Sequence, residues 1–396
     1  MHIVADENIP YVKDAFGTLG DVRLISGRKM DAAAVREADL LLVRSVTKVG
    51  AALLEGSRVR FVGTATIGTD HVDLPWLQRA RIAFSAAPGS NANSVAEYIV
   101  AALLTLCARR GWTLAGRSIG VIGVGNVGSR VAAGAAALGM QVLLNDPPLQ
   151  RATRSTSSLR LRSGRAGQAG DAKYRPLEEL LGCDFITLHV PLEKRGTDPT
   201  WHLADAAFLS RMKRGAVLLN SSRGAVADNA ALLRALEEGR LADAVLDVWE
   251  GEPRLNAALL ARAALGTPHI AGYSFDGKVN GTQMLYDAAC KLLGAKPAWD
   301  AASSMPPPET PEMTLQAAGR DEEALLREAV QRIYPIERDD AALRRLLEMP
   351  EPERGPWFDR LRKEYPVRRE FQNTRVRLVG GTLSLEKKLA GIRFKM

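Results

Sequence analysis

The chain has 396 residues, a formal net charge of +8 and 46% hydrophobic residues, a composition typical of a globular protein with roughly two to three domains. Its longest strongly apolar run, residues 98–108, is too short for a membrane span, which needs about 18 apolar residues. Three separated cysteines without a CxxC pair argue against a disulfide framework or a zinc site. The strand-like start MHIVADENIP does not resemble a signal peptide. We therefore expect a cytoplasmic protein without a metal and without a membrane partner.

Most of the net positive charge is contributed by one segment. Between residues 150 and 175 there are seven basic residues and one acidic residue, in a Ser/Gly/Arg-rich context without an apolar period. Such a segment is typical of a surface loop. A nucleic-acid role would require a basic face joined to a recognisable binding module. The chain shows no such module, so we expect no nucleic-acid partner.

The first part of the chain alternates short apolar runs with helical stretches, which predicts a parallel sheet with crossover helices. A helix is expected next, from about Ser94 to Arg110, with Asn91 or Asn93 at its start. The predicted strands are residues 2–6, 21–25, 39–43, 60–65 and 81–86.

A second series of apolar runs begins at Ser118. These runs are nearly continuous and end in polar residues, as expected for parallel strands buried on both faces. In open α/β sheets, ligands bind at the carboxyl ends of the strands. The predicted strands are residues 118–123, 141–146, 184–190, 216–222 and 244–249.

The character of the sequence changes again near Lys291. Residues 305–313 form a proline-rich linker, and a third unit follows with a charged helical part and a β-like end at residues 375–388. The expected fold class is thus α/β, with two Rossmann-like doubly wound parallel-sheet domains and a smaller α+β C-terminal domain.

A glycine motif, Gly123-x-Gly125-x-x-Gly128, follows the first strand of the second series and opens an Ala-rich helix. The motif alone is weak, but Asp146 ends the next strand, and this βαβ context predicts a dinucleotide site. The glycines permit a tight turn, close approach of the pyrophosphate and close helix packing. The expected cofactor-binding residues here are Gly123, Gly125, Asn126, Val127, Gly128 and Asp146.

The Asp146 carboxylate can accept hydrogen bonds from the adenosine ribose, and its charge repels a 2′-phosphate. NAD is therefore expected in preference to NADP. Arg151 and Arg154 follow closely and would weaken that repulsion.

Three polar segments follow: NSSRG places Arg223 after one strand, VLDVWEGEP places Asp247 and Glu252 after the next, and GTPHIAGYS places His269 before a glycine-containing turn. In this order and context, Arg223, Glu252 and His269 resemble the catalytic residues of the D-isomer-specific 2-hydroxyacid dehydrogenase family. The resemblance covers residues 1 to about 290.

Further segments, among them LLVRSVTKV, ATIGTDHVD, HIAGYSFDGK and YPVRREF, resemble one branch of this family over nearly the whole chain. The resemblance implies NAD-dependent oxidation of 4-phospho-D-erythronate to 2-oxo-3-hydroxy-4-phosphobutanoate in pyridoxal 5′-phosphate synthesis. It also implies a substrate-binding domain at 1–93 and 271–290, an NAD-binding domain at 94–270, and a C-terminal domain at 291–396 that forms a homodimer.

The reaction itself needs these residue types. Removing hydride from C2 requires a base for the hydroxyl proton, and histidine titrates near neutral pH. Glu252 would orient the imidazole of His269. The planar guanidinium of Arg223 would hold the substrate carboxylate and the C2 oxygen.

The remaining site residues also follow from the resemblance. Ser45, Thr66 and Tyr273 are expected to contact the substrate, and Arg44 is added because a phosphorylated acid needs more positive charge. Arg368 and Arg369 are considered as phosphate ligands across a dimer interface. The nicotinamide half of the cofactor is expected near Val190, Ser221, Ser222, Asp247 and Gly272.

Alternative functions remain open at this point. Another D-2-hydroxyacid dehydrogenase, such as one acting on 3-phosphoglycerate, would use the same site. A dinucleotide-sensing corepressor also exists on this fold, and fold alone does not exclude it. A scaffolding role through the C-terminal domain is a third possibility.

Overall fold

The computed structural model describes residues 1–153 and 173–396, which form two compact units. Unit 1 comprises Met1–Ala92 and Tyr273–Pro307, and unit 2 comprises Asn93–Gly272 and Pro308–Met396. The loop predicted for the basic segment falls largely on residues 154–172, which lie outside the described residues.

Unit 1 contains a parallel sheet of five strands in the order β2-β1-β3-β4-β5. Residues of α1 (Val12–Phe16) and α12 (Phe275–Leu293) pack on one face, and residues near α2 (Ala32–Val35), α3 (Ala51–Leu54) and α4 (Leu74–Arg79) pack on the other. A short α13 (Ala301–Ser304) follows α12. All five strands lie inside the predicted runs: β1 (His2–Asp6), β2 (Asp21–Ile25), β3 (Leu40–Val43), β4 (Phe61–Thr64) and β5 (Ala83–Ser85).

Unit 2 contains a parallel sheet of six strands in the order β11-β10-β9-β8-β6-β7. Five of the strands were predicted, whereas β11 (Leu265–Gly266) was not, because two residues carry no periodic signal. The predicted strands are β6 (Ser118–Ile122), β7 (Gln141–Asn145), β8 (Phe185–Leu188), β9 (Val217–Asn220) and β10 (Asp243–Leu246).

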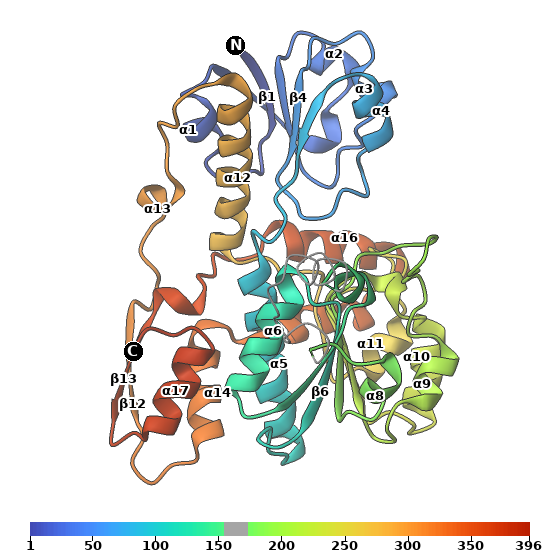
Figure 1. Ribbon diagram of the computed structural model, residues 1–396, viewed down its shortest axis with the longest axis vertical. Coiled ribbons are helices and arrows are strands. Elements are labelled where there is room, and N and C mark those ends of the chain that lie inside the picture. The colour runs from blue at the N-terminus through green and yellow to red at the C-terminus, as the bar shows by residue number, and fades with distance from the viewer. Residues whose placement is uncertain (154–172) are drawn as a thin grey trace, which may run out of the picture. The chain divides into compact units, whose positions relative to one another are not determined.

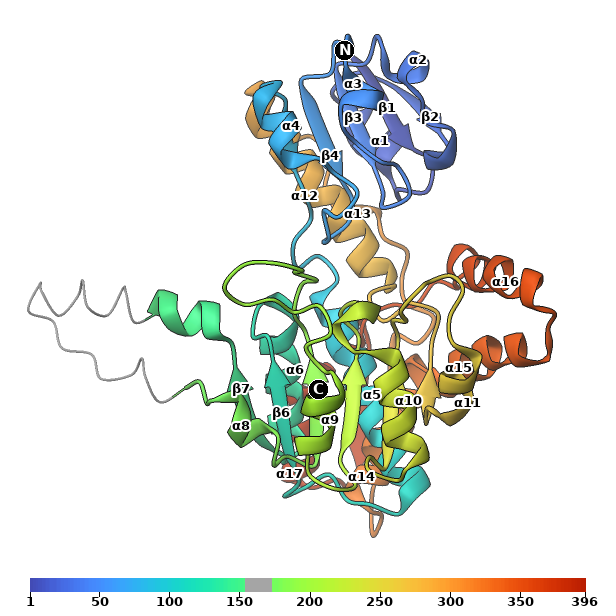
Figure 2. The same ribbon diagram turned by 90° about the vertical axis from the view of Figure 1, so that its right-hand side faces the viewer.

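Helices cover both faces of this sheet. Figure 2 shows α9 (Ala206–Arg211) and α10 (Asn229–Glu237) on one face and α5 (Ala92–Arg110) on the other. Although α5 has 19 residues, no helix in the described part of the chain is apolar enough over sufficient length to cross a membrane. The remaining helices are α6 (Asn126–Ala137), α8 (Leu177–Leu180) and α11 (Ala257–Arg262).

The C-terminal region pairs β12 (Glu312–Gln316) with β13 (Arg375–Val379) in parallel. Its helices are α14 (Glu322–Ile333), α15 (Ile336–Arg344), α16 (Glu351–Lys363) and α17 (Leu383–Gly391), and α17 lies against α6 (Figure 1). Apolar side chains from this region enter the two clusters that fill the faces of the six-stranded sheet. Burial of apolar surface therefore makes the region part of unit 2.

Two expectations for the C-terminal part differ from the structure. A domain boundary at residue 291 falls inside α12, where Cys290 and Leu293 pack in unit 1. The β-like prediction for residues 375–388 is wrong for its second half, which is helical in α17. Thr382 caps this helix by accepting the Leu385 N–H at 3.0 Å, and such a cap starts a helix at this position.

Candidate active site

The cofactor-binding positions predicted from the sequence lie at the carboxyl edge of the six-stranded sheet. Gly123 follows β6, Asp146 follows β7, Val190 follows β8, Ser221 follows β9 and Asp247 follows β10. Strands β6 and β8 are adjacent, so the chain reverses its winding direction between them. Such a switch point is where open α/β sheets bind ligands.

The three glycines of the motif have different surroundings. Gly123 has φ 85°, and a Cβ there would lie 2.6 Å from the His189 carbonyl oxygen. A Cβ at Gly128 would lie 1.9 Å from the Gly123 oxygen, whereas one at Gly125 would meet nothing within 4 Å. The first and third glycines are thus required by packing, and the second leaves open space at the start of α6. The backbone N–H groups at the start of α6 have no side-chain cap, and they form a site that fits a pyrophosphate.

Asp146 connects the glycine turn to the next helical segment. One carboxylate oxygen accepts the Val124 N–H at 2.8 Å, and the other accepts the Leu149 N–H at 2.9 Å. An ionised carboxylate has further lone pairs, so ribose hydroxyls can still bind. Arg151 forms an ion pair with Asp198, and Arg154 lies outside the described residues.

The expected nicotinamide contacts include one polar atom that fits a bound group. Ser221 Oγ is buried and has no hydrogen-bond partner among the described residues. Ser222 Oγ, by contrast, donates to Asn220 Oδ1 at 2.8 Å. The side chain of Val190 lies against Gly123, where a Cβ would be 2.8 Å from it.

His269 and Glu252 form the dyad that the sequence predicted. His269 Nδ1 lies 2.7 Å from Glu252 Oε2, and the other Glu252 oxygen accepts the Trp249 N–H at 2.7 Å. Burial alone would raise the pKa of Glu252, but the neighbouring His269 and these hydrogen bonds together hold this pKa below its usual value. An ionised carboxylate only accepts, so Nδ1 carries the proton and Nε2 of the neutral ring is free to act as a base.

Asp247 holds the backbone of the turn that carries His269. Its side chain is 1% exposed. The carboxylate accepts hydrogen bonds from Thr267 Oγ1 and the Ile270 N–H, both at 2.7 Å, and from the Ala271 N–H at 2.9 Å. Burial raises the pKa of Asp247, while His269 and these donors act in the opposite direction. The sequence predicted that Asp247 contacts the cofactor, and it did not predict that this residue holds the backbone of the His269 turn.

The backbone of His269 also needs such support. Its φ is 57°, in the left-handed region that non-glycine residues rarely adopt, and such strain persists only where the surroundings fix the conformation. The His269 N–H donates to the Asp247 carbonyl at 2.7 Å. The Asp247 carboxylate then fixes the two residues that follow.

Arg223 lies on the neighbouring strand end, and its loop packs closely against the segment that leads to Glu252. A Cβ at Gly224 would lie 2.0 Å from the Trp249 carbonyl oxygen, so only glycine allows this contact between backbones. The half-buried Arg223 donates from Nη1 to the Ser222 carbonyl at 2.8 Å. The loop contact thus makes the Arg223 and Glu252 segments neighbours.

The predicted substrate contacts belong to unit 1. Arg44 and the exposed Ser45 directly follow β3, and Thr66 follows the adjacent β4. Thr66 Oγ1 lies 2.7 Å from Thr64 Oγ1 and 3.0 Å from the Gly68 carbonyl. Lys278 Nζ lies 4.5 Å from the ring centre of Tyr273.

Arg368 does not have the solvent-facing position expected of a phosphate ligand. Its side chain is 3% exposed and pairs with Glu97 at 2.9 Å, so the phosphate interpretation of Arg368 is wrong. Glu97 was missed, although a single acidic residue in an apolar helix indicates a buried partner. Arg369 donates to Asn373 Oδ1 at 3.1 Å.

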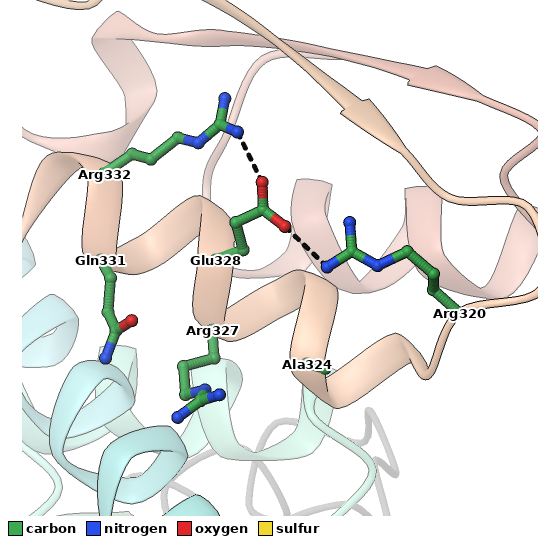
Figure 3. A pocket seen from close by; sticks show the side chains of 6 residues that line it. All are labelled: Arg320, Ala324, Arg327, Glu328, Gln331 and Arg332. Atoms are coloured by element: carbon green, nitrogen blue, oxygen red, sulfur yellow. Dashed lines mark hydrogen bonds and ion pairs between the residues drawn. The ribbon is translucent and has the colours of Figure 1, made fainter.

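A separate groove of about 390 Å³ lies along α14 in the C-terminal region (Figure 3). Within it, Glu328 pairs with Arg320 at 2.8 Å and with Arg332 at 2.5 Å. None of the predicted site residues lines this groove. In the described part of the chain no His, Cys, Asp and Glu side chains form a group suited to hold a metal ion.

The chain is similar to known dehydrogenases. Residues 104–271 match the NAD-binding domain of the D-isomer specific 2-hydroxyacid dehydrogenases, and residues 304–389 match a domain of unknown function. A protein of Salinibacter ruber named erythronate-4-phosphate dehydrogenase is 49% identical over 94% of this chain and 93% of its own length. A protein of Marinobacter nauticus with the same name is 43% identical over the full length of both chains.

A solved structure has a similar fold over about three quarters of the chain. D-lactate dehydrogenase from Aquifex aeolicus, in complex with NAD and lactic acid, aligns with a TM-score of 0.58 and 26% identity. The alignment covers 74% of this chain and 96% of that one. The expected fold class, cofactor and enzyme type are thereby confirmed, and the chain belongs to the D-isomer-specific 2-hydroxyacid dehydrogenase family.

Proposed function

We propose that this protein catalyses the NAD-dependent oxidation of 4-phospho-D-erythronate to 2-oxo-3-hydroxy-4-phosphobutanoate, a step of pyridoxal 5′-phosphate synthesis. The observation that carries the chemistry is the hydrogen bond between His269 and Glu252, at the sheet edge that also bears the glycine turn. The substrate assignment is supported by relatives named erythronate-4-phosphate dehydrogenase, which align over nearly the whole chain.

His269 is the proposed general base. Its Nδ1 proton is held by Glu252, so Nε2 takes the proton of the C2 hydroxyl as the alcohol becomes a ketone. The ionised Glu252 then stabilises the imidazolium that forms. General base catalysis of this kind contributes roughly 10²–10⁴-fold to a rate.

Arg223 is the proposed anchor for the substrate carboxylate. A guanidinium offers parallel donors that match a carboxylate, and it keeps its charge at every physiological pH. The same donors polarise the C2 oxygen and favour the 2-oxo product as charge develops. In unit 1, Arg44, Ser45, Thr66 and Tyr273 remain the proposed substrate contacts.

NAD, when bound, accepts the hydride that leaves C2. Residues Gly123 to Gly128 and the start of α6 would hold its pyrophosphate, and Asp146 would hold the adenosine ribose. The Ser221 Oγ, which has no hydrogen-bond partner in the described part of the chain, and the open space at Gly125 fit this placement. Val190, Ser222, Asp247 and Gly272 are the other proposed neighbours of the nicotinamide half.

We extend the proposal to a homodimer formed through the C-terminal region. It is supported by Val379 at the end of strand β13 and by Leu383 at the start of α17, which are 50% and 66% exposed. Exposed apolar side chains on a strand edge favour association. A cytoplasmic location belongs to the same proposal, and the three free, buried cysteines fit a reducing compartment.

An NAD reduction assay with a panel of hydroxy acids tests the function. The panel contains 4-phospho-D-erythronate, 3-phospho-D-glycerate, D-erythronate and D-lactate, at enzyme concentrations high enough to detect one turnover. We expect the highest kcat/KM with 4-phospho-D-erythronate. A preference for 3-phospho-D-glycerate would identify another member of the family, and NADH binding without turnover of any acid would favour a sensor.

A further inference from the structure

The most deeply buried ion pair described in unit 2 joins the C-terminal region to α5. Arg368 and Glu97 are 3% and 2% exposed at the side chain and lie 2.9 Å apart. The second Glu97 oxygen accepts the Phe371 N–H at 2.7 Å, and the guanidinium of Arg368 lies 4.1 Å from the ring centre of Tyr334. Burying two charges is costly unless their geometry is fixed, so this pair holds residues 368–371 firmly against α5.

The pair is connected to the turn that carries His269. Arg368 Nη2 donates to Ser94 Oγ at 2.6 Å, and Ser94 Oγ donates to the Ala271 carbonyl at 2.7 Å. Arginine has donors only, so the serine oxygen must accept from Arg368. The single hydroxyl proton of Ser94 is thereby directed at the Ala271 carbonyl.

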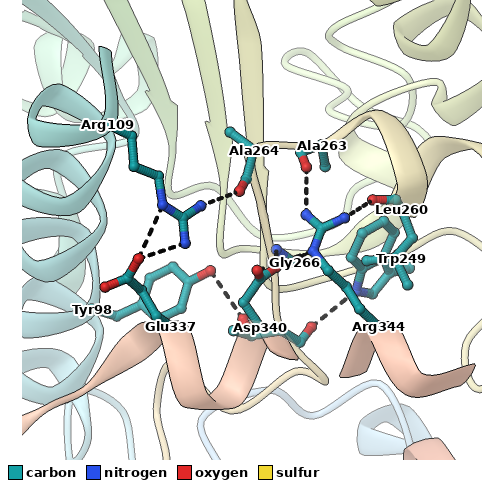
Figure 4. Close-up of polar contacts among 11 residues, drawn as sticks. Tyr98, Arg109, Trp249, Leu260, Ala263, Ala264, Gly266, Glu337, Asp340 and Arg344 are labelled. Carbon is teal, nitrogen blue, oxygen red and sulfur yellow. Dashed lines mark hydrogen bonds and ion pairs between the residues drawn. The ribbon is translucent and has the colours of Figure 1, made fainter. Parts of the chain in front are cut away.

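A second contact from the C-terminal region lies ahead of this turn, between Asp340 and Gly266 (Figure 4). Asp340 of α15 accepts the Gly266 N–H at 2.7 Å, where β11 ends. Arg344 holds this carboxylate with two contacts of 3.0 Å and also donates to the Leu260 carbonyl at 3.0 Å. The C-terminal region thus fixes both the residue that precedes the turn and a residue that follows His269.

We propose that the C-terminal region positions the catalytic base, through Asp340 at Gly266 and through Arg368 and Ser94 at Ala271. Arg368, Ser94 and Asp340 are positioning residues, because they contact the turn and not the substrate. The strained backbone of His269 is the reason that two further anchors are needed beside Asp247. This inference rests on the proposed role of His269 as the base.

The test uses two variants of the full-length protein. Ser94→Ala removes the hydroxyl that joins Arg368 to Ala271 and leaves the Arg368–Glu97 ion pair in place. The double variant E97Q/R368M removes the connection and both charges of this ion pair together. A misplacement of about 1 Å can cost about 10²-fold in rate, and we expect kcat to fall at least about tenfold in both variants.

A matched control weakens a contact of the same region at the opposite edge of the sheet, because an amide oxygen is a weaker acceptor than a carboxylate. Glu323 accepts the N–H groups of Leu114 and Ala115 at 2.8 and 3.1 Å, ahead of β6. Glu323→Gln should lower the melting temperature and leave kcat within about twofold of the original. NADH affinity should change by less than kcat in both test variants, because the pyrophosphate site at the glycine turn is untouched.

A spectroscopic measurement keeps this inference separate from the proposed function. The chain has five histidines, so ¹⁵N-histidine labelling and His269→Ala identify the downfield Nδ1 proton that bonds to Glu252. We expect this resonance to shift or broaden in Ser94→Ala and in E97Q/R368M, but not in Glu323→Gln. The proposed function fails if the original protein turns over none of the acids. The inference fails if the resonance and kcat are unchanged in both test variants, or if Glu323→Gln changes them equally.

Discussion

The turn after β11 and the loop after β3 each carry a predicted site residue, but the structure supports them differently. The His269 turn is fixed by the Asp247 carboxylate, whose oxygens accept three hydrogen bonds. In unit 1, Arg44 is partly exposed and Ser45 is exposed. The proposed base is thus preorganised, whereas Arg44 and Ser45, two of the proposed substrate contacts, are exposed to different degrees.

This difference indicates that the two sheet edges, one in unit 2 and one in unit 1, have different roles in the proposed mechanism. Proton transfer demands a fixed distance and direction, so a backbone held by buried acceptors is suited to it. Recognition of a charged acid tolerates more adjustment, because charge attraction acts over a range of geometries. Substitutions at the fixed edge should therefore have larger effects than substitutions at the exposed one.

The largest effect is expected for His269→Ala. Loss of the base should lower kcat by roughly 10²–10⁴-fold, measured by NADH formation with 4-phospho-D-erythronate. Fluorescence titration with NADH should give an unchanged Kd, because the glycine turn remains intact. A variant that retains normal kcat would remove His269 from the mechanism.

The next effect is the loss of folding stability in acid. It is compared between His189 in unit 2 and His71 in unit 1. Burial lowers the pKa of His189, after β8, from 6.5 to about 3. Below pH 6.5 the unfolded chain therefore takes up a proton that the folded chain does not, and stability falls with pH down to about 3. The contribution of His189 to the free energy of unfolding should change by about 1.4 kcal/mol per pH unit in this range and should be independent of pH above 6.5.

Urea unfolding at a series of pH values measures this slope. The variant His189→Gln should show a flatter acid dependence than the original chain. His71, after β4 in unit 1, is the matched comparison, since burial lowers its pKa while Asp70 opposes the change. His71→Gln should alter the slope less, and an equal alteration would contradict the contrast between the edges.

A smaller effect is expected for Asp146→Ser. Loss of a charged hydrogen-bond acceptor for the ribose should weaken NAD binding by about tenfold. Removal of the negative charge should also reduce discrimination against NADP, since the 2′-phosphate is no longer repelled. The ratio of kcat/KM for the two cofactors measures this change, and an unaltered ratio would exclude Asp146 from the ribose site.

The smallest effect is expected for Arg44→Ala at the exposed edge of unit 1. A partly exposed charge contact is worth little, so KM for 4-phospho-D-erythronate should rise by about fivefold with little change in kcat. High salt should reduce the difference from the original protein. Lys48→Ala is a control on the same loop, and an equal rise in its KM would mean that only net charge matters.

Much of the sheet architecture follows from local pattern. Ten strands of the two large sheets coincide with predicted runs, because parallel strands buried on both faces are continuous apolar segments. The glycine motif and Asp146 were placed correctly at adjacent strand ends for the same reason. Strand β11, with two residues, has too little sequence for any period, although it carries the turn of His269.

Long-range partners of charged residues could not be predicted in this way. Arg368 lies 271 residues from Glu97 along the chain, and no spacing rule connects them. Glu97 inside the apolar helix α5 indicated that some cation must be buried there, but not which one. Helix α17 was misread as β-like, since its start depends on the single capping residue Thr382.

The shared core of unit 2 has a consequence for protein engineering. The NAD-binding fold and the C-terminal region fill common apolar clusters, yet residues 273–307 of unit 1 separate them along the chain. A graft of this fold onto another substrate unit must therefore transfer residues 93–272 and 308–396 together, with two junctions instead of one. Cutting the chain at residue 307 would expose the apolar side chains of both clusters that pack against the C-terminal region.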